Sequence, residues 1–118
     1  MADPKQIADN YLSTWNAPAA ERTPHLAGWA EDAHYVDPLM RGQGRDGIAE
    51  MMDAAVTQFP GYRFALDGTP DGHDRYVRFS WTLNAGDGAV AARGTDVVKL
   101  DENGRIADVI GFLDGVPA

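Results

Sequence analysis

The chain of 118 residues carries 18 acidic against 10 basic residues, a formal net charge of -8, and no cysteine. This length fits one domain over residues 1–118, with a core that needs no cross-links. The lack of cysteine excludes disulfide frameworks, thiolate metal sites and thiol nucleophiles. A hydrophobic content of 44% is too high for a disordered, solvating segment, so the chain is expected to fold.

The charge pattern also limits the partners of the protein. Lys and Arg are nowhere concentrated, which argues against nucleic acid, because phosphate binding needs basic clusters. No apolar stretch approaches the roughly 20 residues needed to cross a bilayer. The first residues, Met1 to Pro4, are polar and acidic, unlike a signal peptide. We therefore expect a cytoplasmic protein without nucleic-acid or membrane partners.

Apolar residues in the first half of the chain recur at helical spacing, which predicts three helices. An N-cap hydroxyl and a first-turn proline mark the second of them at Thr23-Pro24, and Pro60-Gly61 ends the third. The predicted helices cover residues 5–16, a two-turn segment from Thr23 through Trp29 and Ala30, and residues 48–59. A flexible approach containing Gly42, Gly44 and Gly47 leads to the third.

A short strand is predicted over residues 33–37, and after Gly61 the hydrophobic period changes to two. Turn residues, including Pro70-Asp71-Gly72, divide this second half into further strands. These strands cover residues 62–68, 75–84, 90–100 and 105–113. Helices followed by strands indicate an α+β fold, with three N-terminal helices on a largely antiparallel sheet.

Asp96 lies on the unexpected side of its predicted strand. Gly94, Val98 and Leu100 share its side and are apolar, so its carboxyl is expected to face the core. A carboxyl in such a place must be hydrogen-bonded, paired or protonated. The alternatives are a bulge that returns Asp96 to solvent and a purely structural buried bond.

Asp37 and Tyr11 are the other candidate catalytic residues. Asp37 ends the short strand before Pro38, where a side chain can project into a cavity mouth, although Asp-Pro is also a common turn dipeptide. Tyr11 shares the first helix stripe with Ile7 and Trp15, so it is expected to face the core, either as simple packing or with its hydroxyl in a site.

Cofactor chemistry finds no support in the sequence. His25, His34 and His73 lie too far apart for a metal-ligand spacing. Neither a phosphate-binding loop nor a G-x-S-x-G elbow is present. We therefore expect no metal and no cofactor.

Several short motifs lie in a fixed order along the chain. They are Trp29-Ala30-Glu31-Asp32-Ala33, Tyr35-Val36-Asp37-Pro38, Gly42 with Ile48, Gly94-Thr95-Asp96 and Gly104-Arg105-Ile106. Over nearly the whole chain this set resembles the cystatin-like α+β cone superfamily, which includes nuclear transport factor 2, scytalone dehydratase, SnoaL-like polyketide cyclases and ketosteroid isomerase. The resemblance implies a strongly bent sheet around the first helix, a conical pocket closed by the third helix, and a homodimer formed through the sheet.

Within that superfamily the catalytic pattern is similar to ketosteroid isomerase. Its helix-one tyrosine is matched by Tyr11, its general base by Asp37 before a proline, and its protonated aspartate by Asp96. The resemblance implies that Asp37 abstracts a proton beside a carbonyl while Tyr11 and neutral Asp96 donate hydrogen bonds to the enolate oxygen. Where the isomerases carry a further tyrosine in helix three, this chain has Met51-Met52.

The resemblance also implies a pocket for a small hydrophobic molecule. Its expected lining is Trp15, Trp29, Met52, Phe59, Phe79 and Trp81. Related epoxide hydrolases use an Arg-x-Asp pair and a last-strand Asp, but here Arg93 and Asp96 are three residues apart and Gly111 takes the last-strand position. A SnoaL-like polyketide cyclase and a non-catalytic ligand-binding or dimerisation module are the remaining alternatives to an isomerase.

Overall fold

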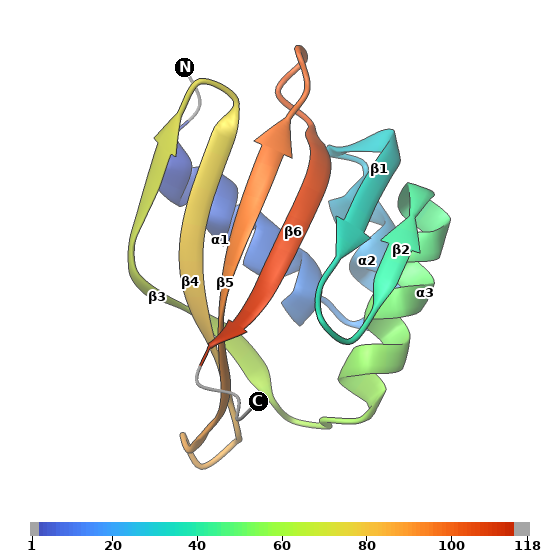
Figure 1. The fold of residues 1–118 in the computed structure, drawn as a ribbon. Coiled ribbons are helices and arrows are strands. Elements are labelled where there is room, and N and C mark those ends of the chain that lie inside the picture. Colours follow the sequence, from blue (N-terminus) through green and yellow to red (C-terminus); the bar gives the residue numbers. More distant parts are fainter. Residues whose placement is uncertain (1–2, 115–118) are drawn as a thin grey trace.

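The computed structural model describes residues 3–114 of the chain. Three helices and two strands make up the first half, and four strands make up the second half (Figure 1). The helices are α1 (Pro4–Asn16), α2 (Ala19–Leu26) and α3 (Gly44–Thr57), and the strands are β1 (Trp29–Val36), β2 (Arg41–Gln43), β3 (Arg63–His73), β4 (Tyr76–Asn84), β5 (Val90–Leu100) and β6 (Ile106–Asp114).

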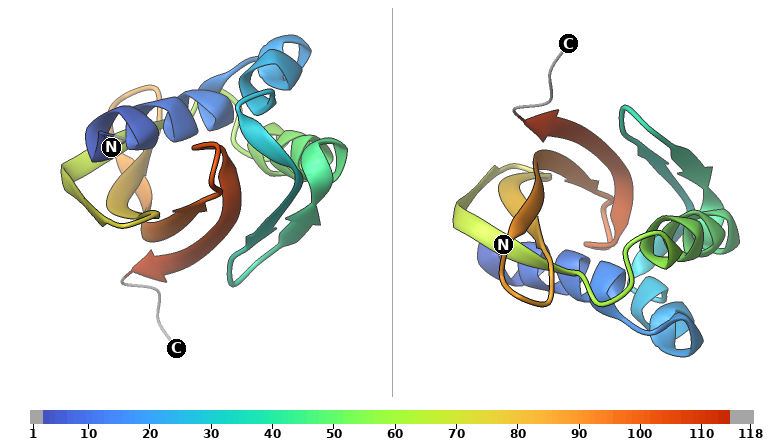
Figure 2. Two further views of the ribbon diagram at one scale, coloured as in Figure 1. Left: turned by 90° about the horizontal axis from the view of Figure 1, so that it is seen from above. Right: turned by 90° about the horizontal axis from the view of Figure 1, so that it is seen from below.

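The six strands form one mixed sheet in the order β2-β1-β6-β5-β4-β3. All neighbouring pairs are antiparallel except β1 with β6, which run parallel. The sheet curves without closing, α1 crosses its concave side, and α3 packs beside β1 and β2 (Figure 2). The predicted α+β class with three helices is confirmed.

The first helix shows why this sequence folds onto the sheet. The Asp3 carboxylate accepts a hydrogen bond from the Lys5 backbone N–H at 3.0 Å and caps the helix, and Pro4 occupies its first turn. The buried face carries Ala8, Tyr11, Leu12, Thr14 and Trp15. This apolar stripe at helical spacing anchors α1 against the bent sheet.

The position predicted for the second helix is wrong. The observed helix α2 begins at Ala19, directly after Pro18. Pro24 lies inside α2 near its end, where the missing N–H removes only one backbone hydrogen bond of a short helix. Trp29 and Ala30, assigned above to this helix, begin β1 instead. Both residues are buried in β1. Adjacent apolar residues occur in buried strands as well as in helices, so the pattern did not distinguish the two.

Two turn predictions based on glycine and proline are also wrong. Residues 41–43 form β2 instead of a flexible approach, and α3 begins at Gly44, whose φ of 73° suits the entry to the helix. Pro70 lies inside β3, which is an edge strand and tolerates a missing donor there. The chain reverses later, at Asp74, whose φ is 53°.

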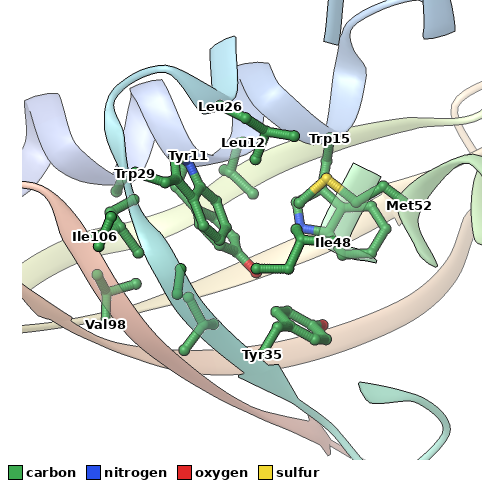
Figure 3. Packing of buried hydrophobic residues seen from close by; sticks show 14 of the residues in the cluster. Tyr11, Leu12, Trp15, Leu26, Trp29, Tyr35, Ile48, Met52, Val98 and Ile106 are labelled. Atoms are coloured by element: carbon green, nitrogen blue, oxygen red, sulfur yellow. The ribbon is translucent and has the colours of Figure 1, made fainter. Parts of the chain in front are cut away.

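The core lies between the helices and the concave side of the sheet. Its most deeply buried large side chains include Tyr11, Trp29, Ile48, Met52 and Val98 (Figure 3). Within residues 3–114, no helix combines the length and the apolar character that crossing a membrane requires.

Candidate active site

A largely apolar cavity of about 340 Å³ opens between α1, the start of β3 and the concave faces of β4, β5 and β6. Tyr11, Asp37 and Asp96, the three residues proposed from the sequence as catalytic, all line it. The side chains on its wall that carry a polar or charged group are Tyr11, Trp15, Asn16, Arg22, Tyr35, Asp37, Tyr62, Trp81 and Asp96.

Asp96 accepts two side-chain hydrogen bonds at the inner end of this cavity. The Tyr11 hydroxyl donates to Asp96 Oδ2 at 2.7 Å, and the Trp81 indole N–H donates to Asp96 Oδ1 at 3.1 Å. Asp96 is 2% exposed and Tyr11 is 1% exposed. The burial predicted from strand alternation is therefore confirmed, and no bulge returns this carboxyl to water.

Burial controls the ionisation of this pair. Desolvation raises the pKa of Asp96 to about 6, against the opposing effect of the hydrogen bonds from Tyr11 and Trp81, and the nearby Asp37 and Asp114 carboxylates raise it further. The same desolvation, followed by the charge of Asp96, raises the pKa of Tyr11 well above its usual value. Tyr11 is thus a hydrogen-bond donor at every physiological pH.

Asp37 lies immediately after β1 and is half-buried. The Tyr35 hydroxyl donates to Asp37 Oδ2 at 2.6 Å. The backbone N–H groups of Leu39 and Met40 donate to Asp37 Oδ1 at 2.8 and 2.9 Å. Three donors therefore fix the carboxylate, and the turn that joins β1 to β2 is built on it.

Gly111 of β6 brings the two carboxyls together. Parallel pairing aligns Val36 with Ile110, so Asp37 arrives beside Gly111, while antiparallel pairing places Asp96 opposite Gly111. A Cβ at position 111 would lie 2.8 Å from Asp96 Oδ1 and 3.2 Å from Asp37 Cβ. The two Tyr–Asp pairs are therefore neighbours across a position where only hydrogen fits.

A second glycine makes room for the indole that reaches Asp96. A Cβ at Gly94 would lie 2.2 Å from Cζ2 of Trp81, so the indole lies directly over the β5 backbone. The Phe64 ring packs edge-on against Trp81 at 5.2 Å between centroids, and the Trp15 ring also packs against Phe64, at 5.2 Å between centroids. These rings form an aromatic wall beside the carboxyls.

The residues expected to line the pocket separate into two groups. Trp15, Phe59 and Trp81 lie on the cavity wall. Trp29, Met52 and Phe79 lie in the packed core, each at most 2% exposed, and are not among the residues that line the cavity. Figure 3 shows Trp29 and Met52 among the core side chains. The Tyr11 ring separates two of them from the cavity, since it stacks on Trp29 at 5.8 Å and packs edge-on against Phe79 at 5.2 Å.

Sequence reasoning missed one hydroxyl in this site. Tyr35 takes a position beside the carboxyls, although the chain has no tyrosine at the helix-three position of the isomerases. Tyr35 and Ala33 are buried on the same face of β1. Strand alternation counted back from Asp37 therefore indicates that Tyr35 faces the same side as Asp37. Burial, followed by the charge of Asp96, raises the pKa of Tyr35, which keeps it a donor.

Histidines take no part in the cavity. His34 is exposed and faces Asp108, with 3.9 Å between Nδ1 and Oδ1. Within the described range, 3–114, no cluster of three His, Cys, Asp or Glu side chains could hold a metal ion.

Comparison with known proteins gives the family. The sequence matches the SnoaL-like domain family over residues 8–109, so the chain belongs to that family. A crystal structure of a candidate isomerase of the SnoaL-like family from Agrobacterium tumefaciens is 54% identical, with a TM-score of 0.91, and the match covers 93% of this chain and 96% of that one. No curated protein matches the sequence.

More distant structures share the fold. A nuclear transport factor 2-like protein of unknown function from Mesorhizobium loti is 22% identical with a TM-score of 0.68, covering 98% of this chain and 97% of that chain. A protein of unknown function with a cystatin-like fold from Methylobium petroleophilum is 21% identical with a TM-score of 0.74, covering 98% and 78%. The predicted superfamily is confirmed.

Proposed function

We propose that the protein is a cofactor-free isomerase that moves a proton on a hydrophobic carbonyl compound. The observation that carries this proposal is the meeting of two Tyr–Asp pairs across Gly111 at the polar end of an apolar cavity. One carboxyl is buried and has a pKa raised to about 6, and the other is held by three donors at the cavity wall. Carboxyls in unlike environments suit a donor and a base.

In the proposed reaction Asp37 takes a proton from the carbon beside the carbonyl. The C–H electron pair forms the enolate double bond, and negative charge develops on the carbonyl oxygen. On binding, the Tyr11 hydroxyl turns from Asp96 Oδ2 to that oxygen, and neutral Asp96 donates a second hydrogen bond to it. Asp37 then returns the proton to the far end of the enolate, which shifts the double bond into conjugation and restores the carboxylate.

The similar SnoaL-like structure, described as a candidate isomerase, supports this reaction class. The proposed reaction depends on the ionisation state of Asp96. Because the pKa of Asp96 is about 6, Asp96 is neutral and able to donate a hydrogen bond only below about that pH. We therefore expect kcat/KM to fall as pH rises through about 6, because Tyr11 then donates alone.

The test is turnover of β,γ-unsaturated ketones of increasing ring number, from cyclohex-3-enone to a four-ring ketosteroid, followed by ultraviolet absorbance of the conjugated product. Asp37→Asn should lower kcat by about 10²–10⁴-fold, the usual contribution of a general base. Asp74→Asn, on an exposed turn, is the matched control. A rate equal to that in buffer for every ketone, or an unchanged rate in Asp37→Asn, would refute the isomerase.

We also propose that the protein forms a homodimer through the outer face of the sheet. Val36 and Ile110 are paired across β1 and β6 and are 39% and 48% exposed, and Phe112 on the same strand is 55% exposed. Such an apolar strip on a charged surface is typical of an interface. Sedimentation should give a dimer for the wild type and a monomer for Ile110→Glu. A monomeric wild type at micromolar concentration would contradict this proposal.

A further inference from the structure

The ligand-binding polar groups of the cavity are gathered at one end. Tyr11, Asp96, Tyr35 and Asp37 surround Gly111. Asn16 also lies on the wall, but both of its amide atoms are used: Nδ2 donates to the Phe64 carbonyl and Oδ1 accepts from the Phe64 N–H, each at 2.9 Å. Apart from the Tyr62 hydroxyl, which also lies on the wall, a ligand therefore finds its polar contacts at the carboxyl end and mainly apolar surface elsewhere.

Arg22 is the one Lys, Arg or His among the residues of the described chain that line this cavity. Its side chain is 1% exposed, and its charge is paired with the Asp53 carboxylate. Its Nε donates to the Thr14 carbonyl at 3.2 Å, and a terminal nitrogen donates to the carbonyls of Trp15 and Ala17. The guanidinium thus caps the end of α1, and its donors are directed at the protein instead of the ligand.

This arrangement disfavours an anionic ligand. A carboxylate or phosphate needs a partner when it leaves water, and the cation on the wall already has one. The Asp37 carboxylate at the polar end also repels an anionic ligand, because charges interact strongly where water is excluded.

Cavity volume limits the size of the ligand. At 340 Å³ the cavity lies near the low end of the roughly 300–1,000 Å³ range of small-molecule pockets. A ligand that fills a cavity of this size is compact, on the order of two fused six-membered rings with a carbonyl group. The aromatic wall of Trp15, Phe64 and Trp81 suits contact with a flat ring system.

We infer that the substrates are uncharged, flat ketones of about two fused rings, and that the Arg22–Asp53 pair excludes carboxylates by withholding the guanidinium from the ligand. This inference rests on the proposed function and names its substrate class. The carbonyl oxygen takes the place of Asp96 Oδ2 as the acceptor of the Tyr11 hydroxyl proton and also accepts from neutral Asp96, and the rings extend along the aromatic wall.

Two probes of equal shape test the charge requirement by calorimetric titration at pH 5.5, where Asp96, with its pKa of about 6, is mostly neutral and 2-naphthoate is still charged. Methyl 2-naphthyl ketone and 2-naphthoate carry the same rings and differ in a methyl group against a charged oxygen. The ketone should bind the wild type at least tenfold more tightly. Equal or tighter binding of 2-naphthoate would overturn the inference.

A second comparison tests the role of the ion pair. Asp53→Asn removes the charge that Arg22 faces, so it should reduce the preference for the ketone several-fold. Glu50→Gln removes one charge from the exposed side of the same helix and should leave the preference unchanged. The same preference in Asp53→Asn as in the wild type would overturn the exclusion by this pair.

The size limit is tested with androstenedione, a four-ring ketone, which should bind at least tenfold more weakly than the naphthyl ketone. Tighter binding of the steroid would overturn the size limit. These binding results are independent of whether the protein proves to be an isomerase. Selective binding without turnover would refute the proposed reaction alone, whereas preferential turnover of the steroid would refute the substrate class alone.

Discussion

Two Tyr–Asp pairs face the same cavity, and their surroundings differ. The pair Tyr11–Asp96 joins α1 to the middle of β5, and both members are almost fully buried. The pair Tyr35–Asp37 lies at the end of β1, where the carboxylate also accepts two backbone N–H groups and is half-buried. Both phenols donate to a carboxylate oxygen at nearly equal length, 2.7 and 2.6 Å.

The difference lies in what surrounds each carboxyl. Asp96 depends on two side-chain donors in an apolar interior, and desolvation dominates its ionisation. Asp37 is part of a turn, and two main-chain donors accompany its phenol. One fold thus places the same residue pair in two environments, which permits opposite roles in proton transfer.

The largest effect that separates the two carboxyls is the pH dependence of stability caused by Asp96. Its pKa of about 6 in the folded protein exceeds the usual 3.8, so the folded state binds more protons than the unfolded state between these values. The contribution of Asp96 to the free energy of unfolding therefore falls as pH rises from about 4 to about 6 and is constant above that range. The difference of roughly two pKa units corresponds to about 3 kcal/mol.

Urea unfolding of the wild type and Asp96→Asn between pH 4 and 7.5 measures this contribution. The free energy of unfolding of the variant should lack this fall, so its difference from the wild type should change by about 3 kcal/mol over the window. Asp74→Asn, on an exposed turn, should follow the wild type at every pH. If the free energies of unfolding of the wild type and Asp96→Asn changed with pH in parallel, the raised pKa of Asp96 would be contradicted.

Gly111→Ala should disturb both pairs together. The added Cβ would meet Asp96 Oδ1 at 2.8 Å and Asp37 Cβ at 3.2 Å, so at least one carboxyl must move. Such overpacking costs about 1–3 kcal/mol, and a displacement of about 1 Å can lower turnover about 100-fold. Urea unfolding and ketone turnover measure the two effects.

The matched control for this substitution is Gly86→Ala, because a Cβ at Gly86 would have no atom within 4 Å. It should retain wild-type turnover and stability. A Gly111→Ala protein with normal stability and turnover would show that the two pairs do not depend on each other's position.

The Tyr11–Asp96 pair could be predicted from the sequence to a larger extent than the Tyr35–Asp37 pair. β5 alternates without interruption around Asp96, so parity alone indicated its burial. Tyr35 was missed although it alternates with Ala33 and Asp37 within the predicted strand, because the resemblance placed the supporting tyrosine in helix three and not in this strand. The parallel pairing of β1 with β6, which brings Asp37 beside Gly111, joins segments far apart in the chain, and no local pattern encodes it.

The smallest effects distinguish the two phenols. At pH 7.5 Tyr11→Phe removes one of two donors from a buried charged carboxylate, which should cost about 1.5–3 kcal/mol of stability. Tyr35→Phe should cost about 1 kcal/mol or less, because Asp37 keeps both backbone donors. Urea unfolding measures both variants.

Tyr62→Phe is the control for these substitutions, because Tyr62 lines the same cavity and packs on Phe59 at 5.5 Å between ring centroids. The same loss of one hydroxyl there should leave stability within about 0.5 kcal/mol of the wild type. Equal losses from Tyr11→Phe and Tyr35→Phe would mean that the turn gives Asp37 no independent support. A larger loss from Tyr11→Phe would show that burial, and not the residue pair, determines how strongly each carboxyl depends on its phenol.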